Sequence, residues 1–294
     1  MGMYTSVRLK KWVLAAAAAL ALGCAAGGLL KGAGAVEADA PAREGTPLPV
    51  IMYHGLLRDE ALQGDYVISP ELLESDMAYL QEQGYTALHI QDLLDYVDGK
   101  AGLPEKPVLL TFDDGYYNNY LYAYPLAQKY QMKLVIAPIG YYTDQYSETK
   151  DEHAPYSHIT WDQMAEMQES GLVEFQNHTY NLHGSGGQRL GTKKLAGESS
   201  EAYAALLSED LMRMQKKMED HLGRAPSCFV YPFGAVSETE PEIIRSLGFR
   251  CTLTCESRIN YITRDAECLY GLGRWRRPPG TPSREFFQEI LGGA

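Results

Sequence analysis

Short apolar runs alternate with amphipathic stretches over most of the 294-residue chain. The apolar runs predict β-strands and the amphipathic stretches predict helices. The longest helical stretch, 201–222, carries apolar residues along one helical face, as expected for a helix that lies on a sheet. The predicted strands are 49–54, 86–90, 107–113, 132–138, 172–177, 227–233 and 249–255. This alternation favours an α/β fold, a parallel sheet closed into a distorted (β/α)7-8 barrel with its site at the carboxyl ends of the strands.

Polar residues predict where three of the helices begin. Ser69 before Pro70 is typical of an N-cap followed by the first helical residue. The segments 160–163 and 237–240 have the pattern of capping boxes. About 250 residues, 41–294, suit one domain of this α/β type.

Two adjacent carboxylates, Asp113 and Asp114, end the apolar strand, and Gly115 opens the turn that follows. An apolar strand of this kind is typical of a parallel sheet covered on both faces. Two acids at its end repel each other unless a cation separates their roles, with one carboxylate as a metal ligand and its neighbour as a base. The plainer alternative is a strand end followed by an Asp-Gly turn.

A second polar cluster follows the predicted strand 172–177, where His178 and His183 stand five residues apart. Neutral imidazole is a common ligand for zinc, and two His with one Asp leave a position open for water. A spacing of five does not fit one helical face, so the two rings must converge through a turn. Solvated loop histidines are the alternative, but the nearby pair of aspartates favours a metal site.

These segments resemble the polysaccharide deacetylase family, carbohydrate esterase family 4, with its NodB-homology domain. "TFDDG" (111–115) matches the first family motif, "HTYNLH" (178–183) the longer form of the second, and "YPFG" (231–234) the third. The second motif and the opening strand "PVIMYHGL" (49–56) resemble the poly-N-acetylglucosamine deacetylase subgroup. The resemblance covers about residues 48–280.

The resemblance implies a chemistry and a set of roles. Asp114, His178 and His183 would hold a divalent metal, zinc by ligand type, with nickel, cobalt or iron also compatible. Asp113 would be the general base for a water that attacks the acetamide carbonyl. The third motif would contact the substrate through Tyr231 and Phe233, with the backbone N–H of Phe233 stabilising the oxyanion.

The sequence departs from the common family pattern in two places. No His follows His221, so the general acid must come from elsewhere. His54, at the end of the first strand, fits a circularly permuted arrangement. We expect its ring near the metal, on the far side from Asp113; a strand-capping His is the alternative. Val230 replaces the usual Arg of the third motif, and Arg274 in "YGLGRWRR" is expected to support the base, with Arg276 and Arg277 as alternatives.

The first forty residues have the character of an export signal. Basic residues precede a nineteen-residue uncharged stretch, 12–30, which is also long enough to span a bilayer as an uncleaved anchor. Cys24 hints at a lipoprotein box. Without residues 1–40 the chain carries 22 basic and 36 acidic residues, a balance that argues against nucleic-acid binding and polyanionic substrates.

Four cysteines remain after the signal: Cys228, Cys251, Cys255 and Cys268. Export permits disulfides, and four cysteines allow three pairings. Reduced, buried thiols are the alternative.

Together these features predict an exported, monomeric, metal-dependent hydrolase of the extracellular space or cell envelope. It would remove N-acetyl groups from a carbohydrate polymer that contains N-acetylglucosamine. Two alternatives are a glycan-binding pseudoenzyme of the same fold and a deacylase of a small amide or acyl ester.

Overall fold

A parallel sheet forms the centre of the computed structural model, which describes residues 44–184 and 187–292. Its strands lie in the order β12 (Trp275–Arg276), β2 (Val50–Tyr53), β6 (Pro107–Asp114), β7 (Leu134–Pro138) and β8 (Val173–Phe175). The short strand β5 (Thr86–Ala87) pairs with the start of β6. All eight residues of β6 are buried, as expected for a strand that runs through the middle of a covered sheet.

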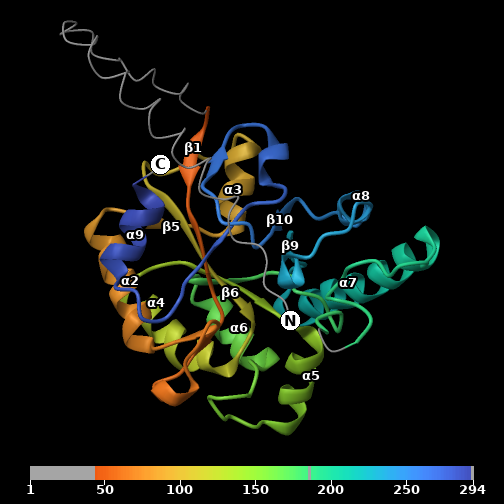
Figure 1. Cartoon of the computed structure of the whole chain (residues 1–294), viewed down its shortest axis with the longest axis horizontal. Coiled ribbons are helices and arrows are strands. Elements are labelled where there is room, and N and C mark those ends of the chain that lie inside the picture. The colour runs from red at the N-terminus through yellow and green to blue at the C-terminus, as the bar shows by residue number, and fades with distance from the viewer. Residues whose placement is uncertain (1–43, 185–186, 293–294) are drawn as a thin grey trace, which may run out of the picture. The chain divides into compact units, whose positions relative to one another are not determined.

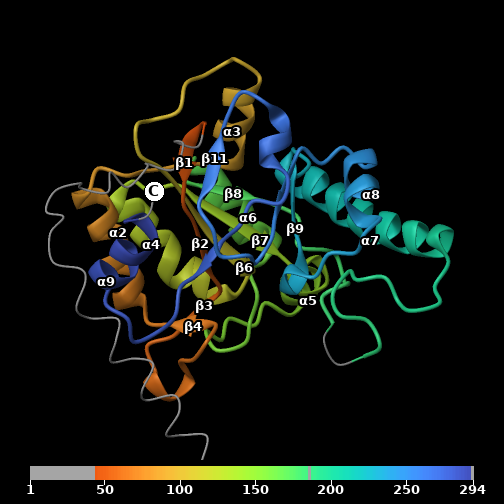
Figure 2. The ribbon, with the colours of Figure 1, turned by 45° about the horizontal axis from the view of Figure 1, so that its top comes forward.

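Further pairings bend this sheet into a ring. Strand β9 (Cys228–Val230) pairs in parallel with β10 (Cys251–Leu253). A parallel bridge between Asn177 and Phe229 joins the end of β8 to β9, and another between Leu253 and Leu272 joins β10 to the segment that enters β12. Figure 2 shows β2, β6, β7 and β8 together in the middle of the view, with β9 to their right. The predicted fold class, an α/β fold of distorted-barrel type, is confirmed.

Each of the seven predicted strands coincides with an observed strand, which is shorter in every case except β6, one residue longer than predicted. The sequence did not predict β1 (Thr46–Leu48), β3 (Gly55–Leu56), β4 (Val67–Ile68), β11 (Asn260–Ile262) or β12. These strands are two or three residues long, too short for a periodic pattern. Strand β1 pairs with β11, and β3 pairs with β4.

Eight α-helices surround the strands in the described part of the chain. They are α2 (Pro70–Glu82), α3 (Ile90–Val97), α4 (Tyr124–Tyr130), α5 (Gly140–Thr149), α6 (Trp161–Glu169), α7 (Ser200–Leu222), α8 (Glu240–Ser246) and α9 (Ser283–Leu291). Figures 1 and 2 both show α2, α4 and α9 side by side on one flank, away from α7 and α8. Shorter turns are η1 (Glu60–Leu62), η2 (Asn119–Ala123), η3 (Pro232–Gly234) and η4 (Ala266–Leu269).

Two of the three predicted helix starts are confirmed. Ser69 caps α2 with Pro70 in the first turn, and Thr160 forms a capping box with Gln163 at α6. The third is wrong, because α8 begins at Glu240 and its N-cap is Thr239 rather than Ser237. The Glu240 carboxylate still accepts a hydrogen bond from the Ser237 N–H at 2.9 Å, outside the helix.

Alternate residues of each strand face two different environments. Inward positions such as Val50, Leu109, Val135 and Val230 pack together inside the ring. Outward positions pack against the surrounding helices, including the buried face of α7. Because side chains alternate along a strand, the inward series that starts at Leu109 continues to Asp113. This places one carboxylate inside the ring.

All four cysteines within the described residues are free thiols. Cys228 and Cys251 are buried, directly opposite partners on β9 and β10, as the alternative of reduced, buried thiols anticipated. The predicted signal or anchor, with Cys24, lies outside the described residues. Within residues 44–184 and 187–292, every helix is too short or too polar to span a membrane.

Candidate active site

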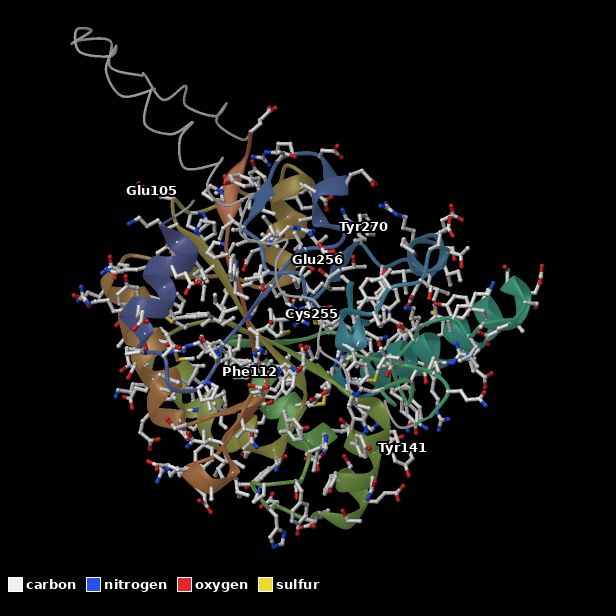
Figure 3. All side chains as sticks on the ribbon, viewed as in Figure 1. Glu105, Phe112, Tyr141, Cys255, Glu256 and Tyr270 are labelled. Carbon is white, nitrogen blue, oxygen red and sulfur yellow. The ribbon has the colours of Figure 1, made fainter. Side chains whose placement is uncertain are left out.

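The residues singled out from the sequence come together at the carboxyl ends of the strands. His54 follows β2, the two aspartates end β6, His178 follows β8, and Phe233 lies in η3 after β9. Figure 3 labels Phe112, directly before the aspartates, and Cys255, which lines the cavity beside them. Both lie near the middle of the view. Residues more than a hundred positions apart therefore share one site, as the barrel prediction required.

The turn after β6 explains the sequence Asp-Asp-Gly. Asp114 and Gly115 both have positive φ, 70° and 71°, so the strand ends in a sharp left-handed turn. A Cβ atom at Gly115 would lie 2.5 Å from the Pro138 Cβ atom, closer than packed atoms approach. Glycine is therefore required there on two counts. The same turn gives Asp114 a direction different from that of Asp113.

Asp114, His178 and His183 offer three ligand atoms within 4.8 Å of one another. The Asp114 Oδ1 atom lies 3.7 Å from His178 Nε2 and 3.3 Å from His183 Nε2. His178 Nδ1 lies 2.7 Å from the Val230 carbonyl oxygen, a hydrogen bond that places its proton on Nδ1 and leaves the Nε2 lone pair facing Asp114.

The electrostatics of these three residues fit a divalent cation. Asp114 Oδ1 is buried and has no hydrogen-bond partner among the described residues, which is costly without a cation beside it. Burial raises the pKa of Asp114 to about 6 and lowers the pKa of His178 to about 3. The imidazole is therefore neutral, the form that binds metals, and the carboxylate gains from a positive neighbour.

Asp113 is held by a different partner. Arg274 Nη1 and Nη2 donate to its two carboxylate oxygens at 2.7 and 2.8 Å, and the guanidinium is fully buried. Burial acts to raise the pKa of Asp113, but the Arg274 guanidinium outweighs it and holds that pKa well below its usual range. The other two arginines lie elsewhere: Arg276 contacts Asp65 at the rim, and Arg277 pairs with Asp76 beneath. Of the three candidate arginines, Arg274 is thus the one that contacts Asp113.

His54 lies at the mouth of the site, at the end of β2, the strand between β12 and β6. Its Nε2 atom is 3.9 Å from Asp113 Oδ2, and its ring lines the pocket. The expectation that His54 lies on the far side from Asp113 is wrong, because β2 and β6 are adjacent strands and their ends stay close. Burial lowers the pKa of His54, and the nearby Asp113 opposes that effect. The backbone carbonyl of His54 accepts a hydrogen bond from Asn119 Nδ2 at 2.7 Å.

The third motif divides between the pocket and the core. Phe233 has a positive φ of 59°, and its half-exposed ring packs on His183, with centroids 4.6 Å apart. The Tyr231 side chain is buried against Phe229, away from the pocket. A substrate contact through the Tyr231 ring is therefore wrong. The reason is strand alternation, which turns positions 229 and 231 toward α7.

A cavity of about 530 Å³ opens above these residues. Its walls include site residues predicted from the sequence and others that were not predicted to line it. The latter are Met52, Tyr66, Tyr116, Cys255 and Ser257; Arg276, an alternative candidate beside Arg274, also lines the cavity. Tyr116 follows the first motif directly and was within reach of sequence reasoning. Tyr66 comes from the unpredicted β3–β4 turn, which gave no signal.

The fold and this arrangement of side chains define a class: an α/β barrel whose strand ends bring together a carboxylate and two imidazoles, a ligand set suited to a catalytic divalent metal. The comparisons with known proteins identify the family. Residues 100–252 match the family model for polysaccharide deacetylase, which covers half of the chain. The chain belongs to the polysaccharide deacetylase family, as its three motifs suggested.

Individual relatives agree with this assignment. The chain is 28% identical over 260 residues to a poly-beta-1,6-N-acetyl-D-glucosamine N-deacetylase of Escherichia coli K12, which aligns with 82% of this chain. The chain spans 38% of the length of that relative. Among solved structures, a de-N-acetylase from Aggregatibacter actinomycetemcomitans is 30% identical with a TM-score of 0.66, covering 78% of this chain and 94% of that one. IcaB from Ammonifex degensii is 29% identical with a TM-score of 0.65, covering 80% and 93%.

Proposed function

We propose that this protein is a metal-dependent hydrolase that removes N-acetyl groups from a cell-surface polysaccharide containing N-acetylglucosamine. The observation that carries the proposal is the pairing of two differently held carboxylates in one pocket. Asp113 is fixed by Arg274, and Asp114 presents an unpartnered oxygen to two imidazoles. The names of the relatives, N-deacetylases of poly-beta-1,6-N-acetyl-D-glucosamine, support the choice of substrate class.

Asp114, His178 and His183 would hold the divalent metal, with zinc favoured by the ligand types. When bound there, the ion would supply Lewis-acid activation of a water and of the acetamide carbonyl. Asp114 and His178 are buried and His183 is partly exposed, so bulk water has limited access to the ligand atoms. The remaining steps fall to side chains of this chain.

Asp113 would act as the general base that accepts the proton of the attacking water. Its bidentate pairing with Arg274 keeps the carboxylate ionised and fixes its orientation. His54 would deliver a proton to the leaving nitrogen, since an amide anion is too basic to depart unassisted. Phe233 would line the acetyl side of the pocket, where its backbone N–H is suited to stabilise the oxyanion.

The proposal is tested by measuring acetate release from oligomers of β-1,6-linked N-acetylglucosamine, with and without a chelator. We expect release that stops with the chelator and returns when zinc is added. The matched variant Asp113→Asn should bind the oligomers and release no acetate. Oligomer binding without release by the wild-type protein would indicate a glycan-binding pseudoenzyme. Hydrolysis of a small acetamide or ester alone would indicate a small-molecule deacylase. Export to the extracellular space or cell envelope, with possible membrane attachment through the N-terminal segment, and a monomeric state are parts of the same proposal.

A further inference from the structure

The loop between the two imidazoles of the site has an unusual backbone conformation. Thr179, which follows His178 directly, is fully buried and has a positive φ of 78°. A positive φ is strained in a β-branched residue, and it persists only where surrounding contacts hold the chain in place. The contacts that hold residues 178–183 therefore also decide where the His178 and His183 rings point.

One side of this loop is held by the first turn of α5. The Gly140 N–H donates to the Thr179 carbonyl oxygen at 3.1 Å, and the Tyr141 N–H donates to the Tyr180 carbonyl oxygen at 2.8 Å. N–H groups in the first turn of a helix have no partner within the helix, so the loop carbonyls satisfy them. These two bonds involve backbone atoms alone and fix the carbonyl groups of the loop.

The N–H groups of the loop are held by one carboxylate of α7. Asp210 Oδ1 accepts a hydrogen bond from the Tyr180 N–H at 2.8 Å, and Asp210 Oδ2 accepts one from the Asn181 N–H at 2.8 Å. Hydrogen bonds from backbone N–H groups to an ionised carboxylate are shorter and stronger than those between neutral groups. Asp210 thus holds two successive peptide groups, both of which lie between the two histidines in the chain.

Helix α7 gives this carboxylate a rigid support, because its apolar face is buried in the core beside β9. The Leu211 carbonyl oxygen, next to Asp210 in the helix, accepts a hydrogen bond from Asn177 Nδ2 at 3.1 Å. Asn177 Oδ1 in turn accepts one from the Thr179 N–H at 2.8 Å. Helix α7 therefore contacts the chain on both sides of His178, and the strained residue lies between these contacts.

The geometry of the candidate metal site depends on this loop. The Nε2 atoms of His178 and His183 lie 3.7 and 3.3 Å from Asp114 Oδ1, and the two ring centroids are 4.8 Å apart. The peptide groups that Asp210 holds connect the two rings, so a shift of these groups changes the separation of the ligand atoms. Metal affinity is sensitive to the residues that orient the ligands.

We propose that Asp210 is a positioning residue for the metal site: through the two peptide groups it holds, it sets the separation and direction of the His178 and His183 rings. This inference rests on the proposed function, because it takes these two imidazoles as metal ligands. Both Asp210 oxygens are engaged by the loop, so Asp210 acts through the main chain and is not itself a ligand. The sequence gave no signal for this role, because Asp210 lies 30 residues from Tyr180.

The test measures the Kd for zinc by competition with a chromophoric chelator, starting from metal-free protein. Asp210→Asn keeps the shape of the side chain but turns an NH₂ donor toward a loop N–H group. Its Kd should be weaker by roughly 10- to 100-fold, the range for residues that orient metal ligands. Asp210→Ala removes both acceptor oxygens and should lose affinity in the same range. Urea unfolding of the metal-free proteins establishes that each variant is folded in the assay.

Glu209→Gln is the matched control. Glu209 is the exposed neighbour of Asp210 on α7, and the substitution removes the same charge. Because an exposed charge is screened by solvent and salt, the Kd of Glu209→Gln should stay within about 2-fold of wild type. Cobalt in place of zinc reports the ligand geometry. The visible absorption band should change in position or intensity in Asp210→Asn and match wild type in Glu209→Gln.

These measurements separate the inference from the proposed function. Unchanged zinc affinity in both Asp210 variants would overturn the positioning role. Equal losses in Asp210→Asn and Glu209→Gln, or weaker binding with an unchanged cobalt spectrum, would also overturn it, since either would mark an effect of charge alone. A wild-type protein that binds no zinc would refute the ligand assignment and the positioning role with it. Wild-type protein that binds zinc in an Asp210-dependent way but releases no acetate would refute only the proposed deacetylation.

Discussion

Replacing Arg274 by methionine tests how the site maintains a charged base in a buried position. The side chain is fully buried, with Nη1 and Nη2 bonded to Asp113 and Nε bonded to the Thr254 carbonyl oxygen at 2.8 Å. Methionine fills a similar volume and removes the charge together with all of these donors. Asp113 would then be left as a buried carboxylate without its cation.

The expected magnitude follows from that uncompensated charge. Removing one partner of a buried ion pair typically costs about 3–5 kcal/mol of folding free energy. Arg274 holds the pKa of Asp113 below its usual range, so its loss lets burial raise that pKa. In the variant, protonation of Asp113 in acid relieves the penalty. The stability difference from wild type should therefore be largest at neutral pH and shrink as pH falls. The acid limb of the activity profile should move to higher pH.

The assay is urea unfolding of wild type, Arg274→Met, Asp113→Asn and the double variant, each at pH 7 and pH 5. If the two side chains act as a pair, the double variant should lose less stability than the sum of the two single variants. Arg276→Met is the control, because Arg276 sits at the rim with a 37% exposed side chain and should cost less than about 1 kcal/mol. Additive single losses, or an Arg274→Met cost equal to that of Arg276→Met, would refute the reasoning.

Three further predictions concern histidines. Metal analysis should find about one equivalent per chain and much less in His178→Ala; a variant with full metal content and activity would contradict the ligand assignment. His54→Ala should slow acetamide hydrolysis by roughly 10²- to 10⁴-fold but affect an activated aryl ester far less, because that leaving group needs no proton; equal losses on both would rule out a general acid. Burial lowers the pKa of His89 to about 4, against about 6.5 in the unfolded chain, so protonation favours unfolding as pH falls from 6.5 toward 4, by about 3 kcal/mol at the acid end. His89→Asn should lose less stability than wild type between pH 7 and pH 4.5 in urea unfolding, and parallel losses would show that His89 is not responsible.

The main architecture and the Asp-His-His cluster were within reach of sequence reasoning because their signals are local. The buried strand β6 can be recognised from its largely apolar composition, and its last two residues are Asp113 and Asp114. The helix start at Ser69 depends on one side chain and the N–H of Leu72, three residues away. His178 and His183 are close in the chain, and both follow the strand that carries them.

The partners of these residues depended on the tertiary structure. Arg274 lies 161 residues from Asp113, and three arginines within four positions offer the same chemistry. Of these three arginines only Arg274, directly before β12, reaches the Asp113 carboxylate. His54 was placed correctly in the pocket but on the wrong side of it, because strand adjacency cannot be read from composition.

The sequence by itself determined which strands carry the chemistry, since burial, alternation and turn residues act over a few neighbouring positions. Only the tertiary structure decided which side chains lie together. Tyr231 packs into the core, whereas Arg276 on β12 and Tyr66 directly before β4 line the pocket, and each of these strands has two residues. Such short strands carry no periodic signal, and their positions follow from closure of the whole barrel.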